Sequence, residues 1–322
     1  MRALIAIHSS TPPAFRSIFR ALMAGQGNSL RAIFFALGAN LTIAATKGVA
    51  AFITGSGAML AETVHSLADC GNQGLLLLGI RQAKSPPSPD YPLGYGKAIY
   101  FWSFLVAVML FTVGGMFSLY EGAHKLQHPQ PIRYWWWAVG VLTVSIVAEA
   151  ISMKACLTEV NKSRGERSLV RWFRESRQAE LIVIFGEDLA ALLGLIVALG
   201  AVSLAVITGN PVWDAIGTLT IGALLIVIAV FIAIEVKAML IGQSADPVLN
   251  ADMRAFLEAR PEIERVFNLI TLQMGDDIMV AVKARMNHTA APVGETINAV
   301  EVAFKRRFPH VRFSFFEPDN VD

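Results

Sequence analysis

The chain has 322 residues, of which 54% are hydrophobic and only 16% charged, and its mean hydropathy is +0.52. Soluble domains carry about one quarter charged residues, so this composition excludes an ordinary soluble protein and indicates a membrane protein. A formal net charge of +2 is too small to indicate a nucleic-acid partner, and Cys70 and Cys156 have no metal-type spacing.

The hydrophobic residues are concentrated in six long segments. Residues 1–27 precede them, carry three arginines and predict a short amphipathic helix on the cytoplasmic membrane surface. A transmembrane helix needs roughly 20 apolar residues. Segments of that kind cover residues 30–53, 56–82, 99–124, 134–155, 179–207 and 212–241. We therefore expect a six-helix transmembrane domain over residues 28–243.

The lysines and arginines between these segments predict the orientation in the membrane. The connection between the fourth and fifth spans carries six of them, whereas the connection between the fifth and sixth carries none. Such residues concentrate on the cytoplasmic side. We expect a multi-pass protein with both termini in the cytoplasm, and we favour the plasma or inner membrane.

The composition changes after Gly242, and residues 244–322 are expected to form a small cytoplasmic domain. Helical periodicity over 248–260 and around 293–308 alternates with strand-like patterns. Strands are predicted over 266–274, 278–286 and 311–315. The order α-β-β-α-β predicts a two-layer, ferredoxin-like α/β domain.

Two pairs of polar residues interrupt the apolar spans. His65 and Asp69 are one turn apart in the second span, and Glu187 and Asp188 lie in the fifth. At 1.5 Å per residue, Asp69 lies ~20 Å and Asp188 ~14 Å from the cytoplasmic ends of their spans, so the two pairs can meet at one level. Ionisable groups within a bilayer are functional-site hypotheses by default.

The chemistry of these residues suits a divalent metal ion. Imidazole nitrogen and carboxylate oxygens bind zinc and other borderline ions, and four such ligands favour tetrahedral zinc. Carboxylates in an apolar site take up protons when the metal leaves, so metal–proton exchange follows from the ligand set. The simpler alternative is that His65 and Asp69 bind each other or neighbouring helices.

Residues 55–69, GSGAMLAETVHSLAD, resemble the second-helix signature of the cation diffusion facilitator family. Residues 92–97, PLGYGK, are similar to that family's loop before the third helix, and 214–217 and 242–247 match further landmarks. The resemblance runs from about residue 30 to the end of the chain. It implies a homodimeric, proton-coupled exporter of divalent cations, with one pair of ligands on helix two and another on helix five. No resident cofactor is implied, because the metal ion and the protons are substrates.

The helix-five pair departs from the family pattern. Ile184 stands four residues before Asp188, where the family places His or Asp, and it cannot bind metal. Glu187 is rotated by about 100° from Asp188 on an ideal helix. Glu187 is therefore either the fourth ligand or a proton-handling group, in which case Asp188 is the only ligand from helix five. Water or Glu62 are further candidates for completing the ligand set.

The metal itself is expected to be zinc, because His65 resembles the zinc-preferring members of the family. Manganese, iron, cobalt or nickel transport, and a metal sensor or scaffold without transport, are the alternatives. An intramembrane metalloenzyme is disfavoured because the chain has no HExxH motif. His288 and His310 are expected to be surface residues of a cytoplasmic domain without a metal clamp.

Four further polar residues of the spans receive structural interpretations. Lys47 and Glu149 are expected to pair with groups on other helices, and Asp214 is expected to reach the membrane interface. Glu62 is expected to orient His65 from outside the ligand set.

Overall fold

A computed structural model describes residues 29–287 and 292–320, although the side chains of residues 29–39 are not described. The predicted N-terminal segment and His288 therefore lie outside the described residues. The chain divides into two compact units. The first comprises the described residues up to Leu75, with Leu105–Ser163 and Val183–Ala233. The second comprises Leu76–Phe104, Arg164–Ile182 and the described residues from Ile234 onward. The predicted domain boundary after residue 243 stays a prediction.

Long helices occupy all six predicted segments. They are α3 (Ser29–Thr54), α4 (Gly57–Ala83), α5 (Ala98–Met109) continued by η2 (Leu110–Met116) and α6 (Phe117–Gln127), α7 (Trp135–Arg164), α9 (Ala179–Thr208) and α10 (Val212–Gly242). Among the described residues, four segments are long and apolar enough to cross a membrane: Ala98–Gln127, Trp135–Arg164, Ala179–Thr208 and Val212–Glu258. The protein is thus a helical membrane protein, and the count of six spans stays a prediction.

Two features of these helices differ from the sequence expectation. The fourth helix extends to Arg164 rather than 155, because polar helix formers continue it until Gly165 adopts a left-handed φ of +58°. The third contains the π-helical turn η2, an irregularity that is frequent at functional sites and has no simple sequence signature.

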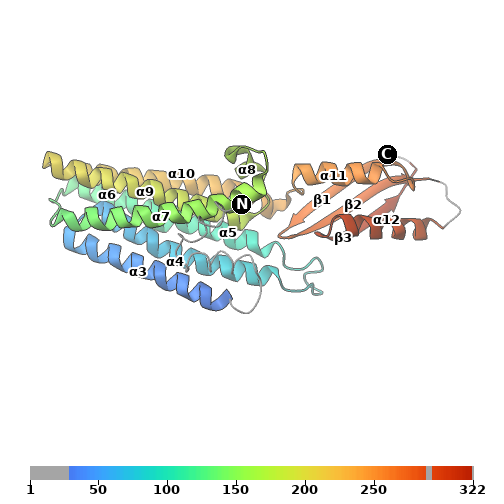
Figure 1. Cartoon of the computed structure of the whole chain (residues 1–322), viewed down its shortest axis with the longest axis horizontal. Helices are drawn as coiled ribbons and strands as arrows, with labels where there is room; N and C mark the ends of the chain where they lie inside the picture. The colour runs from blue at the N-terminus through green and yellow to red at the C-terminus, as the bar shows by residue number, and fades with distance from the viewer. Residues whose placement is uncertain (1–28, 288–291, 321–322) are drawn as a thin grey trace, which may run out of the picture. The chain divides into compact units, whose positions relative to one another are not determined.

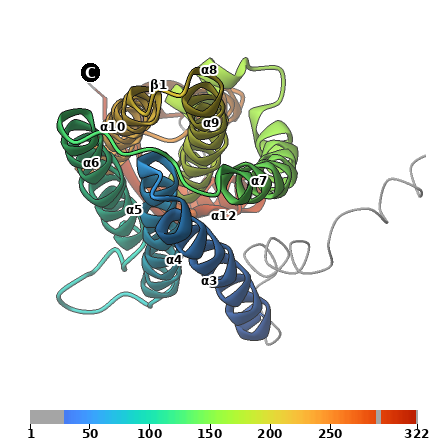
Figure 2. The ribbon, with the colours of Figure 1, turned by 90° about the vertical axis from the view of Figure 1, so that its left-hand side faces the viewer.

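Within the first unit, small residues allow the helices to approach closely. A Cβ on Gly115 would stand 2.5 Å from Ile226, and one on Gly122 would stand 2.7 Å from Leu219, so η2 and α6 pack tightly against α10. A Cβ on Gly186 would likewise meet Ile232 at 2.5 Å. Figure 2 looks along these helices and shows them side by side in a bundle.

The start of α4 is held by a carboxylate from α10. Asp214 accepts hydrogen bonds from Ser56 Oγ at 2.5 Å, from the Gly57 backbone N–H at 2.6 Å and from that of Ala58 at 3.3 Å. These N–H groups have no partner within their own helix, so Asp214 satisfies donors that need an acceptor. The expectation that Asp214 reaches the interface was wrong: the residue is 2% exposed.

The C-terminal part of the second unit forms the predicted α-β-β-α-β order (Figure 1). Its elements are α11 (Pro247–Glu258), β1 (Ile263–Met274), β2 (Asp277–Met286), α12 (Val293–Arg307) and β3 (Val311–Pro318). The sheet order is β1-β2-β3, with β2 antiparallel to β1 and parallel to β3. Residues of both helices and all three strands share one core, which gives two layers. The finer, ferredoxin-like description stays a prediction.

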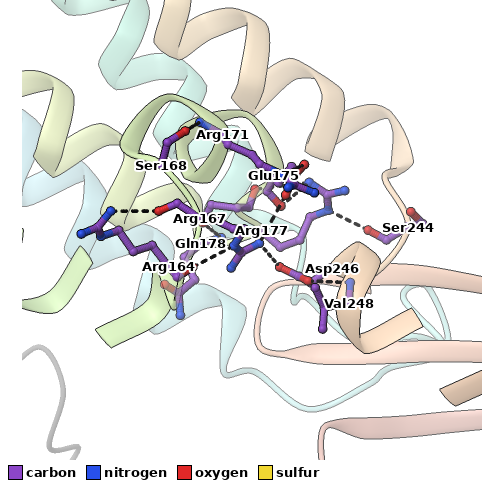
Figure 3. A network of polar contacts seen from close by, with 11 residues as sticks. Arg164, Arg167, Ser168, Arg171, Glu175, Arg177, Gln178, Ser244, Asp246 and Val248 are labelled. Carbon is purple, nitrogen blue, oxygen red and sulfur yellow. Dashed lines mark hydrogen bonds and ion pairs between the residues drawn. The ribbon is translucent and has the colours of Figure 1, made fainter. Parts of the chain in front are cut away.

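The basic connection before α9 contains a short helix that the sequence did not predict, α8 (Leu169–Glu175). Here Arg167 Nη1 lies 2.6 Å from Asp246 Oδ2, and Arg177 Nε donates to the Ser244 carbonyl at 2.7 Å (Figure 3). Burial lowers the pKa of the Arg177 guanidinium, and the neighbouring Asp246 carboxylate opposes that shift. Within the second unit, these arginines therefore hold the segment that leads into α11.

Candidate metal site

One face of α4 carries a stripe of polar side chains inside the first unit. Glu62, His65, Asp69 and Asn72 follow one another at steps of three and four residues, which places them on one side of a helix. Glu62, His65 and Asn72 are fully buried, and the Asp69 side chain is 21% exposed. A helix in a bilayer protein bears such a stripe only where a polar interior or a ligand compensates for it.

His65 and Asp69 are neighbours without a hydrogen bond between them. His65 Nε2 lies 3.6 Å from Asp69 Oδ2, which is too long for a good hydrogen bond. Within the described part of the chain, both ring nitrogens of His65 and Asp69 Oδ1 are buried without a hydrogen-bond partner. Unpaired buried polar atoms are destabilising, and a bound cation would give a partner to Asp69 Oδ1 and to one of the two ring nitrogens.

The π-helical turn η2 passes directly beside the imidazole of His65. A Cβ on Gly114 would stand 3.9 Å from His65 Nδ1, so the absence of a side chain there leaves space at the ring. The Gly114 carbonyl accepts a hydrogen bond from Ser118 Oγ at 2.7 Å. The backbone carbonyl next to the ring thus has a side-chain donor from the following turn of the helix.

Glu187 on α9 points toward α4. Its Oε1 accepts a hydrogen bond from Asn72 Nδ2 at 2.6 Å, and the residue is 8% exposed. Asp69 is a stronger electrostatic neighbour of Glu187 than Asp188 is. The structure thus places Glu187 against Asn72, which lies at one end of the α4 stripe, one turn from Asp69. Asn72 was missed by sequence reasoning, although its position three residues after Asp69 puts it on the same face.

Asp188 points instead toward α7. Its Oδ2 accepts a hydrogen bond from Ser152 Oγ at 3.0 Å. Glu149, one turn before Ser152, is a stronger electrostatic neighbour of Asp188 than Asp69 is. Glu149 therefore lies near Asp188. The sequence did not indicate a role for Ser152, apart from its place one helical turn after Glu149.

Helices α4 and α9 run antiparallel along this stripe. Glu62 lies against Gly194, where a Cβ would stand 2.6 Å from Glu62 Oε1, and Asn72 bonds Glu187 further along. Advancing along α4 thus corresponds to moving back along α9. Asp69 lies between Glu62 and Asn72, and Asp188 lies between Gly194 and Glu187, which agrees with the expectation that the two acidic positions share one level.

The four residues nevertheless do not form a closed ligand set. Within residues 29–287 and 292–320, no three His, Cys, Asp or Glu side chains lie close enough to hold one metal ion. The carboxylates of Asp69, Glu187 and Asp188 repel one another when ionised. A divalent cation or protons must therefore neutralise them before they can approach.

Glu62 does not orient His65, contrary to the sequence expectation. Its Oε2 lies 3.2 Å from Lys47 Nζ on α3, and both side chains are fully buried. Lys47 Nζ also donates a hydrogen bond of 2.8 Å to Ser66 Oγ. The expectation that Lys47 pairs with a group on another helix is confirmed.

Comparison with known proteins agrees with this combination of apolar helices and buried acidic residues. Residues 33–241 match the model of the cation efflux transmembrane domain. The chain belongs to the cation diffusion facilitator (cation efflux) family, and it is thus a membrane transport protein rather than an enzyme.

Three relatives illustrate the range of the family. The chain is 34% identical over 231 residues to the human proton-coupled zinc antiporter SLC30A9, mitochondrial; the match covers 71% of this chain and 41% of the relative. It is 27% identical over 243 residues to metal tolerance protein C4 of Arabidopsis thaliana, covering 75% of this chain and 53% of the relative. It is 23% identical over 288 residues to magnetosome protein MamB of Paramagnetospirillum magneticum, covering 87% and 90%. The chain thus spans about two fifths of the length of the zinc antiporter.

Proposed function

We propose that the protein exports divalent metal ions from the cytoplasm, preferentially zinc, in exchange for protons. The binding residues are His65 and Asp69 on α4 and Glu187 and Asp188 on α9. The observation that carries the proposal is the unpaired, buried state of both His65 nitrogens and of Asp69 Oδ1 within the described residues. One nitrogen and several carboxylate oxygens are the donor set that zinc accepts. The relatives named as zinc antiporters support the choice of ion.

The same ligand set explains the coupling to protons. Asp69, Glu187 and Asp188 together carry three negative charges when ionised, and they lie on the two helices that bring them near the imidazole of His65. In an apolar bundle such a cluster is stable only when a cation or protons neutralise it. Zinc and protons therefore compete for the same oxygens, and each turnover exchanges one for the other.

The orientation and assembly belong to the same proposal. The arginine-rich connection before α9 and the lysine-free, arginine-free connection before α10 support cytoplasmic termini in a six-span bundle. A homodimer with residues 244–322 as its cytoplasmic domain, which the resemblance to the family implies, completes the proposal. The plasma or inner membrane stays the favoured location for this chain.

The test is zinc flux into liposomes that contain the purified protein and an enclosed zinc indicator. Zinc should enter when protons flow in the opposite direction, and Asp69→Ala should abolish the flux. His310→Ala is the control, because His310 is exposed in the cytoplasmic domain. Zinc binding without flux in the unsubstituted protein would favour a sensor or scaffold, and undiminished flux in Asp69→Ala would refute the proposed site.

A further inference from the structure

A fully buried ion pair lies beside the proposed metal site and has no part in the function described so far. Lys47 of α3 and Glu62 of α4 are each 0% exposed, with 3.2 Å between Lys47 Nζ and Glu62 Oε2. An ammonium and a carboxylate removed from water are retained at a considerable desolvation penalty. An ionisable pair at this depth in a membrane bundle is therefore a candidate for a functional role.

Glu62 has the position of a metal ligand. It lies three residues before His65 on the same face of α4, and it interacts electrostatically with that histidine. Its Oε1 is buried and has no hydrogen-bond partner among the described residues. Gly194 leaves the space for this oxygen, because a Cβ at that position would stand only 2.6 Å away. Glu62 thus has an oxygen without a hydrogen-bond partner among the described residues, space beside that oxygen at Gly194, and a position close to His65.

Two contacts with α4 hold the Lys47 ammonium next to Glu62. The ammonium binds Glu62 Oε2 and donates a hydrogen bond of 2.8 Å to Ser66 Oγ, so it is anchored at two points on α4. The same ammonium interacts electrostatically with Asp69 and Glu149. A divalent ion that recruited both oxygens of Glu62 would have to displace this ammonium.

We propose that Lys47 is a tethered competitor of the transported cation, which keeps Glu62 out of the metal's ligand set and thereby limits how tightly the site holds zinc. A transport site must bind its ion well enough to load it and weakly enough to release it. With Lys47 in place, the ion is held by His65, Asp69, Glu187 and Asp188. Without it, Glu62 becomes an additional carboxylate ligand, and release slows. This inference rests on the proposed function.

The test compares zinc binding and zinc flux in Lys47→Met and in the double variant Lys47→Met/Glu62→Gln. Lys47→Met should lower the zinc Kd at least tenfold and slow the flux at least tenfold. The double variant should lose that gain in affinity, because the freed carboxylate is gone. Lys237→Met is the matched control, since Lys237 is an exposed lysine of α10.

A spectroscopic readout separates ligation from a general charge effect. Cobalt bound in place of zinc shows weaker visible absorption when a fifth ligand joins a four-coordinate site, so Lys47→Met should lower that absorption. Unchanged zinc affinity or unchanged cobalt absorption in Lys47→Met would refute the inference, as would a gain in affinity that persists in the double variant.

The experiment stays decisive if Lys47→Met does not fold. The double variant removes both charges and leaves no unpaired ion, so it avoids the main source of instability. If it binds zinc more than tenfold more weakly than the unsubstituted protein, Glu62 is already a ligand and the inference is wrong. Absence of zinc binding in the unsubstituted protein would instead contradict the proposed function itself.

Discussion

Asn72 of α4 donates a hydrogen bond of 2.6 Å to Glu187 of α9, and this bond turns Glu187 toward the face of α4 that carries Asp69. The neighbouring Asp188 points toward α7 instead, where it accepts a hydrogen bond from Ser152. The two adjacent acids thus approach the proposed site from different sides.

The first prediction tests Glu187 as a ligand. Glu187→Gln keeps an oxygen that accepts the hydrogen bond from Asn72, so it removes the charge with little change in packing. We expect the zinc Kd, measured by titration of the purified protein, to rise at least tenfold. The melting temperature should stay within about 2 °C, because the change in stability is below 1 kcal/mol.

Glu166→Gln is the control for that experiment, because Glu166 is exposed and lies in the connection before α8. If Glu187→Gln binds zinc as tightly as the unsubstituted protein, Glu187 is not a ligand, and Asp188 is the only ligand that α9 contributes.

The second prediction concerns the hydroxyl that holds Asp188. Ser152→Ala removes a hydrogen bond of 3.0 Å to Asp188 Oδ2. One such bond to a charged group contributes about 1.5 kcal/mol, so zinc affinity should fall roughly tenfold, far less than in Asp188→Ala. Thr143→Ala is the matched control, because that hydroxyl of α7 bonds the Val139 carbonyl of its own helix. Equal zinc isotherms for Ser152→Ala and the control would show that Ser152 does not position Asp188.

The third prediction concerns the start of α4. Asp214→Ala removes the acceptor of three donors, Ser56 Oγ and the N–H groups of Gly57 and Ala58, and leaves them buried. Loss of a cap and the burial of unpaired donors should destabilise the protein by about 1–3 kcal/mol. Thermal unfolding in detergent measures the effect. Asp252→Ala on the exposed face of α11 should leave the melting temperature unchanged, and an equal result for both variants would contradict the capping role.

The sequence predicted the helices well, because each apolar run ends where Gly, Pro or a charged cluster interrupts it. Five of the six predicted spans agree with the helices to within three residues at both ends. The exception, α7, extends well past its apolar run, since a helix can continue through polar residues such as Lys154 and Glu159. The length of an apolar run thus predicts the part of a helix that crosses a bilayer, but a helix such as α7 can extend beyond that run.

The contacts of the site were less predictable, because they depend on which helices are neighbours. His65, Asp69, Glu187 and Asp188 were recognisable as costly polar residues within apolar runs. That Glu187 meets Asn72 while Asp188 meets Ser152 depends on the rotation of α9 between α4 and α7, which one sequence does not define. These partners follow from tertiary packing.

The fourth prediction separates two roles of Asp246 in the second unit. Its Oδ1 accepts the Val248 N–H at 3.0 Å and so caps α11, while its Oδ2 pairs with Arg167. Asp246→Asn keeps an oxygen for the cap and removes the charge, whereas Asp246→Ala removes both. We expect Asp246→Ala to destabilise the protein by about 1 kcal/mol more than Asp246→Asn, as measured by denaturant unfolding. Equal effects would show that the ion pair alone matters.

The fifth prediction is the pH dependence of zinc binding. Zinc binds the deprotonated carboxylates and the neutral imidazole, so every proton that it displaces lowers the apparent affinity as the pH falls. Between pH 6 and pH 7.5, the logarithm of the zinc Kd should decrease with pH with a slope near the number of protons released. Asp188→Asn removes one group that can exchange a proton, so its slope should be smaller by up to one. A Kd independent of pH in the unsubstituted protein would mean that the empty site holds no exchangeable proton, and proton-coupled exchange through these residues would then be excluded.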